Sequence, residues 1–142
     1  MIIYAKCIKE SQIGKNHEEF IARQNEDYSV YCVGETTVAK HEGKLYCVPL
    51  NYIFRHLHHG EYVAIIEYPN SSTEYTKDLD NKQYEVSMNE QKVLKIFKAN
   101  SRDLIDYVAN EVKDHTSVGR GSMDVKLSAE NVEYFKERFG VK

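Results

Sequence analysis

The sequence has no tryptophan, only two prolines and three cysteines, and no long apolar run. Its cysteines, Cys7, Cys32 and Cys47, are widely spaced and form no C-x-x-C pair, which excludes a disulfide framework and a cysteine-based metal site. No stretch approaches the ~20 apolar residues that cross a bilayer, and the start, MIIYAKCIKE, lacks the features of a secretory signal. We therefore expect buried, reduced thiols, no membrane contact and a cytoplasmic location.

The sequence also lacks a large excess of charge of either sign. The chain carries 19 Lys and Arg against 22 Asp and Glu, a formal net charge of -3. Because no basic platform stands out, nucleic acid is not an expected partner. With 142 residues, 42% of them hydrophobic and 29% charged, the chain has the size and composition of one globular domain over residues 1–142. A domain of this size buries enough surface to fold without a metal, and no cofactor is expected.

Hydrophobic patterning predicts both strands and helices. The expected strands are residues 2–8, 28–33, 44–48, 61–68, 84–88 and 92–97. The expected helices are a short one over 17–23, one over 49–59, one capped by Ser101 and a last one capped by Ser128. Residues 34–43, 69–83 and 115–127 are predicted connectors. The fold class is therefore α+β, a single domain with a mixed or antiparallel sheet of five to six strands and three to four helices.

The segment over residues 49–68 carries the strongest pattern. Pro49 suits the start of a helix and Gly60 its end. Between them, one apolar face repeats at helical spacing: Leu50, Ile53, Phe54 and Leu57. The strand that follows is apolar on both faces, with Tyr62, Ala64 and Ile66 on one and Val63 and Ile65 on the other. Such a strand is expected in the interior of the sheet.

Three histidines at the end of this helix, His56, His58 and His59, form the first candidate site. At about 100° per residue they fan around the helix rather than converge, so no metal site is expected. One interpretation is a set of surface histidines at a helix C-terminus. The other is a ligand pocket at the helix–strand junction. There His56 or His58 acts as acid or base with Glu67 as partner, and Arg55 and His59 contact the ligand.

The stretch SVGRGSMD supplies the second candidate site, Gly119, Arg120, Gly121 and Ser122. Two glycines around an arginine favour a concave nest of backbone N–H groups, with the Arg120 guanidinium as a fork for phosphate or carboxylate. The pattern is not a P-loop and does not run directly from a strand into a helix. A plain flexible linker is therefore the other interpretation.

The segment KLYCVPLNYIFRHLHHGEYVAIIEYP, residues 44–69, resembles a small module that precedes ankyrin repeats in many giant-virus proteins. It is similar as well to stand-alone phage domains of unknown function. The matching residues are Leu45, Tyr46, Ile53, Phe54, Gly60, Tyr62 and Pro69. With the helix after Ser101 the resemblance extends over residues 44–110, without the ankyrin repeats. It implies a viral or phage accessory role. The strand–helix–strand shape also resembles small ADP-ribosyltransferase-like domains, by analogy of fold alone.

No catalytic triad, Cys–His pair or carboxylate pair is recognisable in the local sequence, which favours a protein that is not an enzyme. The leading hypothesis is a small binding or inhibitor protein, a viral or phage anti-defence factor in the host cytoplasm that engages a protein or a nucleotide-like ligand. The alternative is an enzyme on a nucleotide or NAD-like substrate, with ADP-ribosyltransferase-like or phosphate-ester chemistry, a histidine acid/base and Arg120 on phosphate. The 11 tyrosines suit contact surfaces, including self-association into a homo-oligomer.

Overall fold

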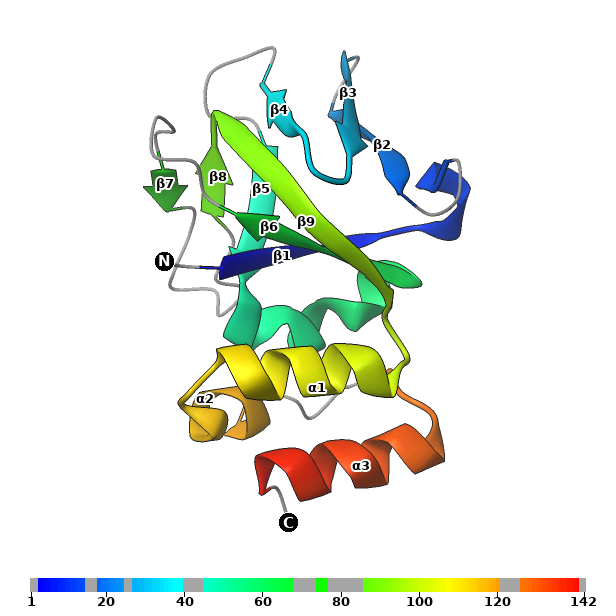
Figure 1. Cartoon of the computed structure of the whole chain (residues 1–142), viewed down its shortest axis with the longest axis vertical. Coiled ribbons are helices and arrows are strands. Elements are labelled where there is room, and N and C mark those ends of the chain that lie inside the picture. The colour runs from blue at the N-terminus through cyan, green and yellow to red at the C-terminus, as the bar shows by residue number, and fades with distance from the viewer. Residues whose placement is uncertain are drawn as a thin grey trace.

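The computed structural model of the chain describes residues 3–14, 18–24, 27–39, 45–67, 74–76, 86–120 and 126–140. Its strands are β1 (Ile3–Ile8), β2 (Glu19–Gln24), β3 (Asp27–Cys32), β4 (Thr36–Val38), β5 (Leu45–Pro49), β6 (Tyr62–Glu67), β7 (Glu74–Thr76), β8 (Val86–Met88) and β9 (Glu90–Lys98). Its helices are the 3₁₀ helices η1 (Glu10–Gln12) and η3 (Leu50–His59) and the α-helices α1 (Arg102–Glu111), α2 (His115–Arg120) and α3 (Ala129–Phe139). Figure 1 shows η3 and the three α-helices gathered at one end of the molecule, below the strands.

The main sheet is antiparallel throughout. Five strands run in the order β4-β9-β6-β1-β5, and β8 and β7 continue the sheet beyond β5. Strands β2 and β3 pair with each other as a separate hairpin of six residue pairs. The predicted α+β class is thus confirmed, with the antiparallel form of the sheet. Among the described residues no helix has the length and apolar character to cross a bilayer.

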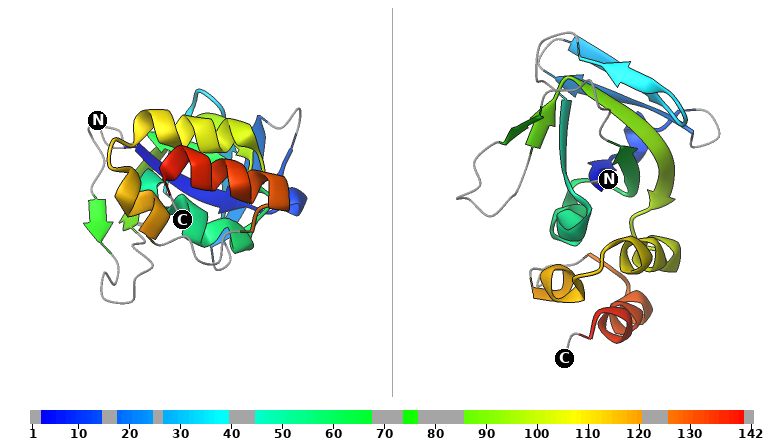
Figure 2. Two further views of the ribbon diagram at one scale, coloured as in Figure 1. Left: turned by 90° about the horizontal axis from the view of Figure 1, so that it is seen from below. Right: turned by 60° about the vertical axis from the view of Figure 1, so that its left-hand side comes forward.

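Strand β6 lies inside the sheet, as its two apolar faces predict. It pairs with β1 on one side and with β9 on the other. Val63 and Ile65 face the core that the helices cover, and Tyr62, Ala64 and Ile66 face the core on the opposite side of the sheet. The second core includes Phe20 and Tyr31 of the hairpin, so the molecule has three layers, namely hairpin, sheet and helices (Figure 2).

The helix caps predicted from the sequence are confirmed. The Ser101 side chain accepts a hydrogen bond from the backbone N–H of Leu104, and that of Ser128 accepts one from Asn131. These hydroxyls satisfy N–H groups that have no partner within the first helical turn. Gly140 ends α3 in the left-handed conformation, with φ 68°.

Two predicted elements are wrong. Residues 19–24 form a strand rather than a helix, because Phe20 is buried and stacks on Tyr31 with ring centroids 4.4 Å apart, while Ile21 beside it is 43% exposed. Residues 115–120 form helix α2 rather than a linker. The Asp114 carboxylate accepts from the backbone N–H of Thr116 at 3.2 Å, and Val118 buries its side chain in the helix-side core.

The predicted connectors contain short strands as well. Strand β4 lies within residues 34–43 and β7 within residues 69–83. Both are three residues long and lie at the two edges of the sheet, where a short strand limits unwanted pairing with other chains. Apart from residues 74–76, the expected loop over 69–83 falls on positions outside the described residues.

A partly buried polar contact links the hairpin to the sheet. The Lys6 ammonium on β1 donates to the Tyr31 hydroxyl at 3.1 Å and to Gln91 Oε1 at 3.2 Å, and it lies 4.4 Å from the centroid of the Tyr31 ring. Gln91 is 0% exposed, and its Nε2 has no hydrogen-bond partner among the described residues. Lys6 is therefore the donor that satisfies the buried carbonyl of Gln91.

We expect Lys6→Met to lower the free energy of unfolding by about 2 kcal/mol, because it leaves the Gln91 carbonyl buried without a donor. The double variant Lys6→Met with Gln91→Leu should recover at least half of that loss, since neither polar partner then remains. Urea unfolding of the wild type, both single variants and the double variant measures the coupling. Losses that simply add would show that the two side chains do not depend on each other.

Candidate functional site

The candidate site is built around η3. Pro49 precedes the helix with φ -55° and ψ 142°, and the predicted apolar face is buried: Leu50, Ile53, Phe54 and Leu57. Phe54 contacts the rings of Phe135 and Phe139 on α3, with centroid distances of 4.9 Å and 5.9 Å. The predicted helix over residues 49–59 is thus confirmed, although its geometry is 3₁₀ rather than α. Its apolar side anchors it between the sheet and α3.

The end of η3 is fixed against β1. Gly60 has an extended backbone, with φ 178°, so it is not needed for a left-handed turn. It is needed for space, because a Cβ atom at this position would lie 2.3 Å from the carbonyl oxygen of Ile8 and 2.8 Å from its nitrogen. This close approach holds the C-terminal turn of η3 beside the second half of β1.

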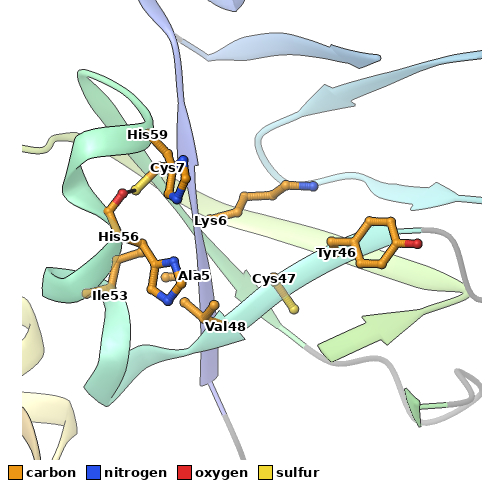
Figure 3. Close-up of a pocket in the computed structure, with 9 residues that line it drawn as sticks. All are labelled: Ala5, Lys6, Cys7, Tyr46, Cys47, Val48, Ile53, His56 and His59. Atoms are coloured by element: carbon orange, nitrogen blue, oxygen red, sulfur yellow. Dashed lines mark hydrogen bonds between the residues drawn. The ribbon is translucent and has the colours of Figure 1, made fainter. Parts of the chain in front are cut away.

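A cleft opens where β1 and β5 separate. Strand β1 pairs with β6 at all six of its residues, but with β5 only at Tyr4 and Ala5. Beyond these two pairs the cleft encloses about 240 Å³. Its lining comes from β1 (Ala5, Lys6, Cys7), β5 (Tyr46, Cys47, Val48) and η3 (Ile53, His56, His59), as Figure 3 shows.

The histidines come closer together than the sequence predicts. The ring centroids of His56 and His59 are 5.8 Å apart, and those of His58 and His59 are 3.9 Å apart. The prediction of diverging rings is wrong. For His56 and His59 the reason is that a 3₁₀ helix turns about 120° per residue and aligns residues i and i+3. His56 and His59 therefore both reach the cleft, whereas the exposed His58 is not part of its lining. No three His, Cys, Asp or Glu side chains are grouped as metal ligands in the described part of the chain.

The half-buried Cys7 closes one wall of the cleft. Its thiol donates to the backbone carbonyl of His56 at 2.9 Å, which links β1 to the last turn of η3 (Figure 3). Burial raises the pKa of the Cys7 thiol to about 12. The side chain is thus a neutral donor at physiological pH rather than a nucleophile, since nucleophilic attack needs the thiolate. None of the three cysteines forms a disulfide.

The raised pKa predicts slow alkylation of Cys7. With a pKa of about 12, roughly one thiol in 10⁴ is ionised at pH 8, whereas an ordinary cysteine is ionised to roughly a quarter. Iodoacetamide should therefore modify Cys7 in the folded protein at least ~100-fold more slowly than in the urea-unfolded chain. The folded rate should rise about tenfold for each pH unit between 7 and 9. Mass spectrometry of the Cys7 peptide over time measures both, and equal rates in the two states would contradict the assignment.

The other predicted site residues are dispersed. Glu67 ends β6, paired with Ile3 and Lys92, whereas the histidines lie near the opposite end of that strand, so the structure does not bring it to the imidazoles. Arg55 lies on η3 with its guanidinium carbon 5.2 Å from the centroid of the Tyr52 ring and is not part of the cleft lining.

Only part of the predicted glycine nest lies within the described residues. Gly119 and Arg120 belong to α2, whose helical backbone directs its N–H groups along the helix axis rather than into a concave nest. Gly121 and Ser122 lie outside the described residues. The SVGRGSMD stretch is therefore in part the end of a short helix.

Several residues that line the cleft carry no signal in the sequence. Cys7, Tyr46 and Cys47 lie in apolar strand segments that are typical of a buried core. Only the tertiary pairing of β1 with β5, and its early end, turns these positions into the wall of a cavity. The side-chain hydroxyl of Ser117 accepts from the Asn51 amide at 3.2 Å and joins α2 to η3. This contact, too, depends on the unpredicted helix α2.

Comparison with known proteins adds no relative. No protein-family model, no curated protein and no solved structure matches this chain.

Proposed function

We propose that this chain is a small binding protein that holds a nucleotide-like ligand in the cleft between β1, β5 and η3. The observation that carries the proposal is the early end of the β1–β5 pairing, which leaves a cavity of about 240 Å³ lined by His56, His59 and Tyr46. Small-molecule sites in proteins are concave and combine apolar walls with a few polar and aromatic groups.

The geometry gives less support to the alternative, an enzyme on an NAD-like substrate. Glu67 is remote from the histidines, and the Cys7 thiol is kept protonated by its raised pKa. The cavity is also smaller than the ~300–1,000 Å³ typical of sites for drug-sized ligands, which leaves little room for a dinucleotide. Binding without chemistry therefore fits the cleft better.

The biological setting of the proposal rests on the resemblance of residues 44–110 to the viral and phage module. In that setting the protein is an accessory or anti-defence factor in the cytoplasm of the host, and it acts as an inhibitor by keeping its ligand from other proteins. A protein partner or self-association is compatible with this role, because half-buried tyrosines such as Tyr46 and Tyr52 suit contact surfaces.

The proposal is tested by thermal unfolding in the presence of nucleosides and nucleotides. A compound that binds the cleft should, at about one hundred times its Kd, raise the Tm by about 5 °C or more. His56→Ala should reduce that rise by at least half. His58→Ala is the matched control on the same helix and should leave it unchanged, because His58 does not line the cleft. The proposal is contradicted if no compound raises the Tm, or if the Tm of His56→Ala rises as much as that of the wild type.

A further inference from the structure

We propose that the cleft binds the uncharged base of a nucleotide, as an isolated flat heteroaromatic ring, and that a phosphate group does not enter it. The inference rests on the proposed function and names the part of the ligand that the site recognises. It follows from the charges around the cleft, from its size and from its walls.

One wall disfavours an anion. His56 and His59 belong to the last turn of η3, so the carbonyl end of the helix borders the cleft. The carbonyl oxygens at a helix C-terminus carry partial negative charge, which repels a phosphate and attracts hydrogen-bond donors. The Cys7 thiol already uses one of them, the His56 carbonyl, at 2.9 Å.

Strand β1 disfavours a cation. Lys6 of β1 is one of the lining residues, and its ammonium donates to the Tyr31 hydroxyl of the hairpin and to the buried Gln91. These two contacts keep the ammonium from closing around a phosphate, yet its positive charge remains near the cavity. No Asp or Glu occurs among the nine lining residues. The partial negative charge at the end of η3 and the positive charge of Lys6 together favour an uncharged ring with a strong dipole, which describes a nucleobase.

The size and walls of the cleft suit a single ring system. Figure 3 shows the imidazoles of His56 and His59 at one end and the Tyr46 ring at the other, with Val48 and Cys47 between them. Aromatic rings at the ends offer stacking contacts, which every nucleobase accepts because each has a π face. A volume of about 240 Å³ is below the range for drug-sized ligands and is adequate for a base.

The test separates a nucleotide into its two halves. The probes are the five common nucleobases, ribose 5-phosphate and the intact 5′-monophosphates, each titrated into the ¹⁵N-labelled full chain at pH 8 and followed by NMR. We expect at least one nucleobase to shift the amide signals of Cys7, Tyr46 and His59 with a Kd of about 1 mM or tighter. Ribose 5-phosphate should leave these signals unchanged up to about 10 mM.

Two variants place the binding in the cleft. Tyr46→Ala should weaken nucleobase binding at least ~5-fold, since it removes one stacking surface. If Tyr46→Ala proves unstable, His56→Ala takes its place and should weaken binding by the same factor. His58→Ala should bind as the wild type does.

Two results would overturn the inference and leave the proposed function standing. The first is that ribose 5-phosphate shifts the amide signals of the cleft residues whereas none of the nucleobases does. The second is that the intact monophosphates shift these amide signals whereas neither the nucleobases nor ribose 5-phosphate does so alone. If no probe shifts the amide signals of Cys7, Tyr46 and His59, both the inference and the proposed function are overturned.

Discussion

Phe54→Ala is expected to lower the free energy of unfolding by about 4 kcal/mol, the largest effect of a single substitution that we predict. Phe54 is 1% exposed and packs against Phe135 and Phe139 of α3. The substitution removes a full aromatic side chain and leaves a cavity between η3 and α3, which the surrounding helices fill only in part. Since a domain of this size has only ~5–15 kcal/mol of stability, the variant should be close to unfolding at 37 °C.

Urea unfolding followed by circular dichroism measures this loss. Phe54→Leu should cost less than half as much, because most of the apolar volume remains. His58→Ala, an exposed change on the same helix, should alter the free energy of unfolding by less than about 0.5 kcal/mol. A loss below about 1.5 kcal/mol for Phe54→Ala would mean that η3 does not depend on Phe54 for its packing on α3.

Gly60→Ala has the second largest expected effect, a loss of about 3 kcal/mol. The added methyl group would meet the backbone of β1, at 2.3 Å from the Ile8 oxygen and 2.4 Å from its carbonyl carbon. A backbone neighbour has no rotamer to change, so either the end of η3 or β1 must move. Because His59 and Cys7 lie on these two elements, the variant should also weaken ligand binding in the cleft.

Gly34→Ala is the matched control. Gly34 has a positive φ of 87° but no atom within 4 Å of the new Cβ, so only backbone strain of about 1 kcal/mol opposes this change. Thermal unfolding of the two variants should therefore show a clearly larger drop in Tm for Gly60→Ala. Equal drops would show that the space between η3 and β1 is not the limiting factor.

The elements predicted correctly from the sequence are those with a strong local signal. Strand β6 is apolar on both faces, η3 has a four-residue apolar face after a proline, and Ser101 and Ser128 cap helices directly. Each of these signals lies within one element, so a single sequence suffices to recognise it.

The elements predicted wrongly depend on distant contacts. In β2 the neighbours Phe20 and Ile21 suit a helix or a strand equally well, and the pairing with β3, with Phe20 stacked on Tyr31, selects the strand. In α2 the glycines and polar residues resemble a linker, and the burial of Val118 among the other helices outweighs that preference.

The candidate site can be predicted only in part. The sequence locates His56 and His59 at the end of a helix, but their common direction follows from the 3₁₀ geometry of η3, which the sequence does not reveal. The other walls of the cleft come from β1 and β5, which lie far apart in the chain. The end of their pairing after two residues is a tertiary feature without a local pattern.

The most direct test of the cleft as a binding site is the position of a bound nucleobase relative to named side chains. Intermolecular nuclear Overhauser effects should connect the ring protons of the tightest-binding base with the rings of His56 and Tyr46, from opposite ends of the cleft. Effects confined to the hairpin, for example to the exposed Ile21 and Val30, would instead place the ligand on another surface and contradict the assignment of the cleft as the binding site.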